Sequence, residues 1–261
     1  MEQILREIGS VVVAFSGGVD STFLLRIALD TLGADKVLAV TATSATYPQT
    51  EFEQACETAK TFGARHTVID TDELGVDGFA DNPPDRCYYC KKELFSKLAD
   101  IARSEGYDAV ADATNADDQS DWRPGRRAAQ ELGIRSPLLD AEITKDEIRA
   151  MSKELGLSTW NKGAFACLAS RFPYGDRITE EKLKKVGLAE HVLRERGFRQ
   201  FRVRHHDTVA RIEVAPEEIP RFHDAAFTAE IVSEIKKAGY NYVALDLDGY
   251  RTGSMNEMID R

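Results

Sequence analysis

The strongest pattern along the chain is an uninterrupted apolar run at residues 11–15 that ends in Ser-Gly-Gly. A short run of β-branched and aromatic residues before glycines is typical of a buried strand. Beyond the glycines, apolar residues recur with helical spacing, at Val19, Phe23, Leu24, Ile27 and Ala28. The pattern therefore predicts a buried strand, a tight turn and a helix.

The same two periodicities alternate through the first two thirds of the chain. Short β-branched runs predict further strands at residues 36–41, 66–70 and 107–112. Helical spacing predicts helices at residues 49–62, 87–105, 124–132 and 144–155, the last with Thr144 and Glu147 placed for a capping box. This alternation predicts an α/β fold with a parallel sheet covered by helices, in which a ligand binds at the carboxyl ends of the strands.

The pattern changes near residue 179. The expected order is helix, strand, strand, helix and strand, at residues 180–196, 201–206, 209–214, 217–238 and 242–247. The two neighbouring strands are close enough to form a hairpin across Asp207 and Thr208. Such an order predicts a smaller C-terminal α+β domain. Glycines and a proline mark the junction, so we expect one domain at residues 1–170 and a second at 171–261.

Composition and charge narrow the class of protein. The chain has 261 residues, of which 43% are hydrophobic and 30% charged, with a net charge of −10. Nucleic-acid surfaces depend on Lys and Arg, so this charge argues against a nucleic-acid partner. No apolar stretch approaches the length of a membrane span, and the first residues lack the pattern of an export signal. We therefore expect a cytoplasmic protein with no membrane partner.

Residues 16–21, Ser-Gly-Gly-Val-Asp-Ser, have the features of a phosphate-binding loop. Gly17 and Gly18 allow the backbone to approach a ligand closely, and the first N–H groups of the following helix point toward it. Ser16 and Ser21 can donate hydrogen bonds, and Asp20 suits a Mg²⁺ ion that bridges it to a nucleotide. The loop lacks the P-loop lysine and the Gly-x-Gly-x-x-Gly spacing. It resembles the PP-loop of ATP pyrophosphatases, and an ordinary strand-to-helix turn is the alternative.

The four cysteines are Cys56, Cys87, Cys90 and Cys167. Without an export signal, thiols, metal ligands or nucleophiles are expected rather than disulfides. We expect Cys56 to be buried packing, because it lies on an apolar helix face. The Cys87-x-x-Cys90 spacing lets two sulfurs reach one metal or cluster from a single turn. A redox pair and half of a zinc site are alternative interpretations of the same spacing. Cys167 lies in an apolar run, and it is either a buried packing residue or a thiol that acts as a nucleophile or ligand.

Two groups of charged residues complete the candidates. Asp117 and Asp118 follow the strand at 107–112, where they could hold Mg²⁺ or orient substrate; a solvated acidic turn is the alternative. Arg202 and Arg204 alternate along their strand, which places both on one face. Paired guanidinium groups can hold a phosphate or carboxylate, and a solvent-facing, salt-bridged strand is the alternative.

Together these motifs resemble the LarE family of ATP-dependent sulfur transferases, which make the nickel-pincer nucleotide cofactor of lactate racemase. The resemblance covers nearly the whole chain. In chain order the matching motifs are Ser16-Gly-Gly-Val-Asp-Ser21, Arg86-Cys-Tyr-Tyr-Cys-Lys91, Thr114-Asn-Ala-Asp-Asp118, Arg123-Pro-Gly125, Ala166-Cys-Leu-Ala-Ser-Arg171 and Arg202-Val-Arg204.

The resemblance implies that ATP adenylylates a carboxylate of pyridinium-3,5-biscarboxylic acid mononucleotide and that sulfur then replaces AMP to give a thiocarboxylate. It implies that Arg202 and Arg204 hold the phosphate of the substrate nucleotide. It assigns ATP phosphates to Ser16, Gly17, Gly18 and Ser21, Mg²⁺ to Asp20, and the transferred sulfur to Cys167. A homo-oligomer and other cofactor-maturation proteins as partners are also expected.

This sequence departs from family members with one cysteine, in which that residue gives up its own sulfur and ends as dehydroalanine. Cys87, Cys90 and Cys167 are the right number to hold three irons of a [4Fe–4S] cluster and leave the fourth open to an extra sulfide. We favour this cluster over a sacrificial Cys167 assisted by a persulfide relay. A tRNA-thiolating PP-loop enzyme, an amide-forming PP-loop ligase and a non-catalytic nucleotide-binding module are the alternatives for function.

Overall fold

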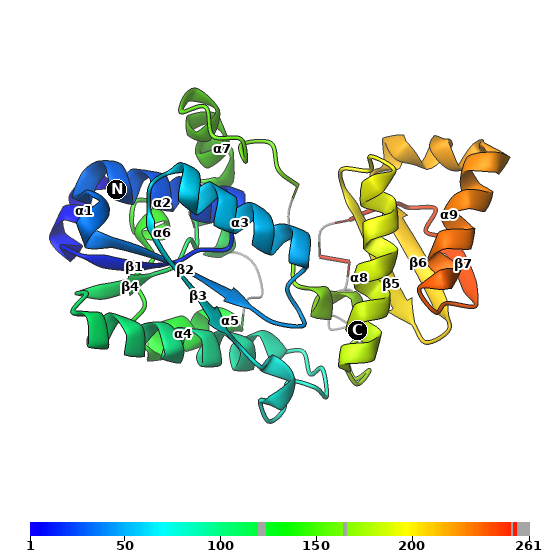
Figure 1. Ribbon diagram of the computed structural model, residues 1–261, viewed down its shortest axis with the longest axis horizontal. Coiled ribbons are helices and arrows are strands. Elements are labelled where there is room, and N and C mark those ends of the chain that lie inside the picture. Colours follow the sequence, from blue (N-terminus) through cyan, green and yellow to red (C-terminus); the bar gives the residue numbers. More distant parts are fainter. Residues whose placement is uncertain (120–123, 164–165, 252, 255–261) are drawn as a thin grey trace. The chain divides into compact units, whose positions relative to one another are not determined.

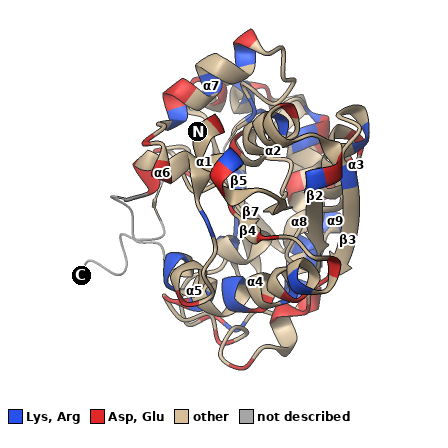
Figure 2. Cartoon of the chain, turned by 90° about the vertical axis from the view of Figure 1, so that its left-hand side faces the viewer, with Lys and Arg blue, Asp and Glu red and all other residues tan. Residues whose placement is uncertain are grey.

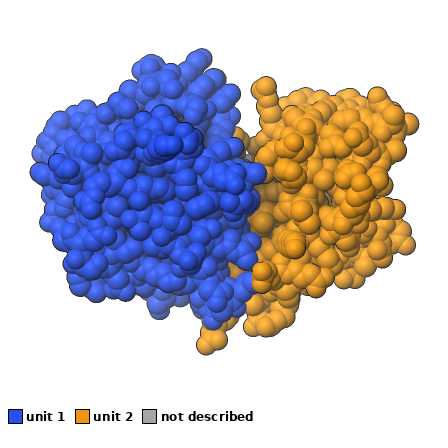
Figure 3. Space-filling view, in the orientation of Figure 1, with its two compact units in different colours: residues 1–76, 85–162 blue, residues 77–84, 163–261 orange. Residues whose placement is uncertain are grey.

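The computed structural model describes residues 1–119, 124–163, 166–251, 253 and 254. The chain forms two compact units (Figure 3): unit 1 contains residues 1–76 and 85–162, and unit 2 contains residues 77–84 and 163–261. Unit 2 thus begins before residue 171 and includes a segment from the first half of the chain. Asn82 explains that inclusion, since its main-chain oxygen accepts from Gly175 N at 2.9 Å and its side-chain Nδ2 donates to Pro173 O at 2.7 Å.

Unit 1 is built on a four-stranded parallel sheet, as predicted. The strand order is β3 (Arg65–Asp70), β2 (Val37–Thr43), β1 (Val11–Ala14) and β4 (Ala109–Ala111). In this register Val11 of β1 pairs with Val37 on one side and Ala109 on the other. The parallel alignment brings the residues that follow β1 and β4 to the same edge of the sheet.

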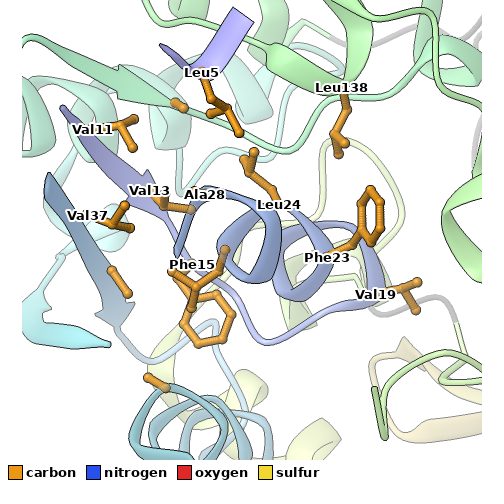
Figure 4. Close-up of a cluster of buried hydrophobic side chains, with 14 of the residues drawn as sticks. Leu5, Val11, Val13, Phe15, Val19, Phe23, Leu24, Ala28, Val37 and Leu138 are labelled. Atoms are coloured by element: carbon orange, nitrogen blue, oxygen red, sulfur yellow. The ribbon is translucent and has the colours of Figure 1, made fainter. Parts of the chain in front are cut away.

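Helices cover both faces of this sheet (Figure 1), because alternate side chains of β1 point to opposite sides. Val11 and Val13 join a buried cluster with Leu24 (Figure 4), and Val12 joins a second cluster with Leu98. The first cluster is formed with α1 (Glu2–Ile8), α2 (Val19–Leu32), α3 (Gln49–Thr61), α6 (Pro137–Asp140) and α7 (Lys145–Glu154). The second is formed with α4 (Arg86–Glu105) and α5 (Gly125–Glu131). The expected α/β architecture is confirmed, and the sequence patterns missed α1 and α6.

Unit 2 contains a three-stranded sheet with the order β5 (Phe201–His206), β6 (Val209–Val214) and β7 (Tyr242–Leu245). Strands β5 and β6 form the predicted antiparallel hairpin, whose turn residue Asp207 has φ 53°, and β7 runs parallel to β6. Helices α8 (Glu180–Glu195) and α9 (Ala225–Lys237) pack with this sheet. The smaller α+β unit is therefore present.

One predicted element is wrong. The single helix expected at residues 217–238 is a 3₁₀ helix, Pro216–His223, followed by α9. The break occurs at Asp224, whose carboxylate accepts hydrogen bonds from the N–H groups of Ala226 and Phe227 and so caps α9. Pro220, which lacks an N–H donor, lies inside the 3₁₀ segment.

The remaining short elements are 3₁₀ helices at Ala34–Lys36, Glu73–Gly75, Ala116–Gln119 and Leu168–Arg171. Within the described part of the chain, no helix combines the length and the apolar character needed to cross a membrane. Basic and acidic residues are interspersed along α4 and α7 (Figure 2).

Candidate active site

The loop between β1 and α2 has the conformation that its glycines permit. Gly17 is buried and adopts φ +63°, which is the left-handed region that side chains disfavour. A Cβ atom built on Gly17 would lie 2.9 Å from the Cβ of Ala55 in α3, so a side chain has no room there. Gly18 is the N-cap of α2 and provides no side-chain cap. The first N–H groups of α2 are thus left to bind an anion.

The two serines of the loop have different environments. Ser21 is 4% exposed, and its Oγ accepts a hydrogen bond from Ser16 N at 3.3 Å and donates to Gly18 O at 3.3 Å. Ser16 is exposed, and its Oγ lies 3.1 Å from Ser21 Oγ. Ser21 therefore holds the loop closed, while the hydroxyl of Ser16 is accessible to a ligand.

Two residues distant in the sequence, Tyr47 and Lys162, contact this loop from outside, and the sequence analysis missed both. The hydroxyl of Tyr47 donates to Ser16 O at 2.7 Å, and burial raises the pKa of this tyrosine, so it stays a donor. Lys162 Nζ donates to Gly17 O at 3.2 Å and pairs with Glu51 Oε2 at 2.6 Å. These contacts link positions that no local spacing relates.

Asp20, in the first turn of α2, points its carboxylate toward a third unpredicted residue, Lys145. Its Oδ2 lies 2.6 Å from Lys145 Nζ, and Oδ1 is buried with no hydrogen-bond partner among the described residues. A buried carboxylate oxygen without a donor is costly unless a cation or donor reaches it. The carboxylate therefore retains one oxygen suited to a metal ion or ligand.

The loop after β4 lies at the same sheet edge, but its carboxylates are engaged in local structure. Asp117 Oδ2 accepts from Lys145 N at 2.7 Å, which fixes the start of α7. Asp118 is 8% exposed, and its Oδ2 accepts from Asn115 N at 3.1 Å. These contacts give both residues a structural role in the turn, and ligand binding by Asp118 stays a prediction. Arg123, part of the motif that follows, lies outside the described residues.

Cys87 and Cys90 lie near the start of α4, three residues apart and therefore on one side of the helix. Cys87 is exposed and Cys90 is half-buried, and neither forms a disulfide. Both belong to unit 1. Their placement leaves two thiols together on an accessible helix turn.

Cys167 belongs to unit 2, where it is half-buried and precedes the 3₁₀ helix Leu168–Arg171. The main-chain oxygen of Cys167 accepts from Arg171 Nη1 at 3.1 Å. Arg171 is 1% exposed and pairs with Glu190 through two hydrogen bonds of 2.7 and 2.9 Å. The buried ion pair thus fixes the backbone at Cys167 and leaves its thiol partly accessible.

Cys56 was expected to be buried packing, and the structure places it only half-buried on α3. Burial raises the pKa of the Cys56 thiol, which keeps it protonated. Over the described residues, no three His, Cys, Asp or Glu side chains come together as a metal-binding group.

Arg202 and Arg204 are 7% and 5% exposed, so the alternative of a solvent-facing strand is wrong. Arg204 pairs with Glu213 at 2.7 Å and donates to Ser170 O at 2.9 Å. Burial, followed by repulsion from Arg171, lowers the pKa of Arg202 to about 10. The guanidinium groups of Arg171 and Arg204 are paired with the buried carboxylates of Glu190 and Glu213, and the charge of Glu190 opposes the shift of Arg202.

Comparisons with known proteins agree with this geometry. The model of the NAD synthase family matches residues 2–81, a span that includes the loop at residues 16–21. Pyridinium-3,5-bisthiocarboxylic acid mononucleotide synthase of Lactiplantibacillus plantarum is 42% identical over 98% of this chain and 92% of its own length. An uncharacterized protein of Synechocystis sp. is 43% identical over 100% of this chain and 97% of its own.

Argininosuccinate synthase of Methanopyrus kandleri is 28% identical, but only over 56% of this chain and 41% of its own length. The likeness to the synthase from L. plantarum, in contrast, extends through both units. The matched region, residues 2–81, is accordingly a PP-loop domain of the kind that binds ATP. The chain belongs to the LarE family of PP-loop ATP-dependent sulfur transferases.

Proposed function

We propose that this enzyme converts the carboxylates of pyridinium-3,5-biscarboxylic acid mononucleotide into thiocarboxylates, as a step in making the nickel-pincer nucleotide cofactor. The observation that carries the proposal is the 42% identity over 98% of the chain to a synthase named for the bisthiocarboxylic acid product. The chemistry is consistent with a PP-loop, because a carboxylate accepts a sulfur nucleophile only after its oxygen has become part of a leaving group. Adenylylation makes AMP that leaving group and releases pyrophosphate.

In this proposal the ATP phosphates are bound by the N–H groups at Gly17 and Gly18, the Ser16 hydroxyl and the start of α2. Ser21 maintains the loop from its buried position. A Mg²⁺ ion fits at Asp20, because Oδ1 is buried without a hydrogen-bond donor. The cation would supply charge neutralisation for the triphosphate, and every other contact comes from the chain.

Arg202 and Arg204 are proposed to bind the phosphate of the pyridinium nucleotide. Support comes from the lowered pKa of Arg202, which reflects burial and the nearby charge of Arg171. A dianionic phosphate would relieve that repulsion and accept charge-assisted hydrogen bonds. Ser170 O, which accepts from Arg204, connects the arginines to the segment that carries Cys167.

Cys87, Cys90 and Cys167 are proposed to hold a [4Fe–4S] cluster. The donor set fits, because two uncrosslinked thiols share one helix turn and the third is half-buried and free of a disulfide. Bound there, the cluster would supply an iron without a protein ligand that can carry a transferable sulfide. The proposed ligand set takes two cysteines from unit 1 and one from unit 2.

The first experiment measures AMP and pyrophosphate after incubation with Mg²⁺ and ATP, with and without the pyridinium nucleotide. The proposal expects AMP to form only when the pyridinium nucleotide is present. Formation of AMP with transfer RNA instead would identify a tRNA-thiolating enzyme, and formation of an amide from ammonia would identify a ligase.

The second experiment tests the cluster by anaerobic purification with analysis of iron and acid-labile sulfide. Replacement of Cys87 by Ser should abolish the cluster. Replacement of Cys56 by Ser should retain it, because Cys56 lies on α3 and is not one of the three proposed ligands. An iron-free protein that still performs many turnovers would contradict the cluster. Loss of the Cys167 sulfur after a single turnover would establish the sacrificial mechanism.

We further propose a cytoplasmic homo-oligomer that takes a small nucleotide as substrate and exchanges it with other cofactor-maturation proteins. Support for the substrate class is the name of the relative from L. plantarum. Light scattering coupled to size-exclusion chromatography measures the oligomeric state, and a monomeric mass would contradict that part of the proposal.

A further inference from the structure

Lys145 reaches the side chain of Asp20 in the PP-loop from a distant helix, whereas Tyr47 and Lys162 contact main-chain oxygens of the loop. It is the first residue of α7, 125 positions after Asp20, and its Nζ lies 2.6 Å from Asp20 Oδ2. Among the described residues, Asp20 provides the only acceptor for this ammonium group. An ammonium group has three donors, so Lys145 retains donors for a ligand.

The main chain of Lys145 is firmly held. Its N–H donates to Asp117 Oδ2 at 2.7 Å, and the preceding residue, Thr144, forms a full capping box with Glu147. The backbone of Lys145 is thereby fixed at the sheet edge where β1 and β4 end. Its flexible stem of four methylene groups can move the ammonium group without any movement of this backbone.

The ion pair itself is weakly held. The side chains of Lys145 and Asp20 are 31% and 24% exposed, and ion pairs accessible to solvent contribute little to stability. Lys162 is different, because its ammonium group contacts Glu51, Gln54 and Gly17 and is 19% exposed. Lys162 therefore has the contacts of a fixed support, and Lys145 those of a group that can change partners.

We propose that Lys145 exchanges Asp20 for the β- and γ-phosphates of ATP when the nucleotide binds, and that it is a catalytic residue of the adenylylation step. In that step a carboxylate oxygen of the substrate forms a bond to the α-phosphorus, and the bond from this phosphorus to the bridging oxygen breaks. The electron pair stays on pyrophosphate, where negative charge grows. The ammonium group of Lys145 stabilises that charge without giving up a proton. This inference rests on ATP cleavage by the PP-loop and is independent of the sulfur acceptor.

Binding measurements separate this role from a structural one. Isothermal titration calorimetry with α,β-methylene-ATP and Mg²⁺ should show about 10- to 100-fold weaker binding by Lys145→Ala than by the unaltered enzyme, the range expected for a lost charge-assisted hydrogen bond. Binding of AMP, which lacks the β- and γ-phosphates, should be unchanged. If Lys145 only supported the fold, Lys145→Ala would weaken the binding of both ligands equally, and that outcome would overturn the proposal. Equal affinities of Lys145→Ala and the unaltered enzyme for the methylene analogue would overturn it as well.

The chain offers a matched control in Arg26→Met, which breaks an exposed ion pair of 2.8 Å with Asp30 on the same helix as Asp20. This variant should bind both ligands normally. Lys145→Arg keeps the charge and should recover part of the affinity for the methylene analogue. None of these readouts requires the pyridinium nucleotide, so failure of the proposed substrate would leave this test intact.

Discussion

Replacement of Gly17 by Ala tests whether the PP-loop depends on close contact with α3. The added methyl group has two separate costs. At φ +63° an L-residue loses about 1–2 kcal/mol relative to glycine. The methyl carbon would also lie 2.9 Å from Ala55 Cβ and 3.0 Å from Ala55 Cα, and Ala55 is fully buried. Overpacking of this kind typically costs about 1–3 kcal/mol.

The control for this prediction is Gly63→Ala, at the end of α3. Gly63 has φ +65°, and a Cβ atom built there meets nothing within 4 Å. Gly63→Ala therefore incurs the conformational cost alone. We expect Gly17→Ala to lose about 1–3 kcal/mol more stability than Gly63→Ala, which for a unit of this size lowers Tm by about 2–4 °C per kcal/mol.

Thermal unfolding followed by circular dichroism measures the stability difference, and calorimetry with α,β-methylene-ATP measures the function of the loop. We expect Gly17→Ala to weaken nucleotide binding at least roughly tenfold, because relief of the clash must displace the N–H groups that face the phosphates. Gly63→Ala should bind normally. If the two variants unfolded at the same temperature and bound the nucleotide equally, the close contact with α3 would have no role.

Three further predictions concern the elements that support the sites. Thr144→Ala removes the cap of α7 and should cost about 1 kcal/mol, measured by denaturant unfolding, with no effect expected from Thr61→Ala at the last position of α3. Burial alone would raise the pKa of Glu190, but Arg171 outweighs it and the net shift is downward. The pair should therefore stabilise the enzyme above the ordinary pKa of 4.5 and lose this contribution as pH falls below it, a dependence that Glu190→Gln should flatten in acid-unfolding curves. Lys162→Met removes one partner of the 2.6 Å ion pair with the buried Glu51 and should cost about 3–5 kcal/mol in unfolding free energy, and an unchanged value would refute the assigned support role.

Much of unit 1 could be predicted because its patterns are local. The apolar run at residues 11–15, the two glycines and the helical spacing after Val19 lie within a few residues of one another. The same locality explains the success with the capping box at Thr144 and the hairpin around Asp207. The break at Asp224 could also have been predicted, since an Asp before an apolar run is an N-cap signal. Helical periodicity on both sides of Asp224 instead favoured one continuous helix.

The contacts of Tyr47, Lys145 and Lys162 with the PP-loop could not be predicted in this way. Each depends on how separate elements pack, and a lysine near a helix start reads like any surface residue. The burial of Arg202 and Arg204 was hidden for the same reason. The carboxylate that pairs with Arg204, Glu213, comes from another strand, and the charge of Glu190, which acts on Arg202, comes from α8. Segment 77–84 joins unit 2 through hydrogen bonds of Asn82, which no sequence periodicity marks.

The measurement that tests the central claim most directly is mass spectrometry of the pyridinium nucleotide after incubation with the enzyme, Mg²⁺, ATP and a sulfide source under anaerobic conditions. The account predicts that an oxygen of the carboxylate is replaced by sulfur, with one AMP formed for each replacement, and that Lys145→Ala slows both events together. Formation of AMP with no sulfur in the nucleotide would contradict the assignment of this chain to thiocarboxylate synthesis.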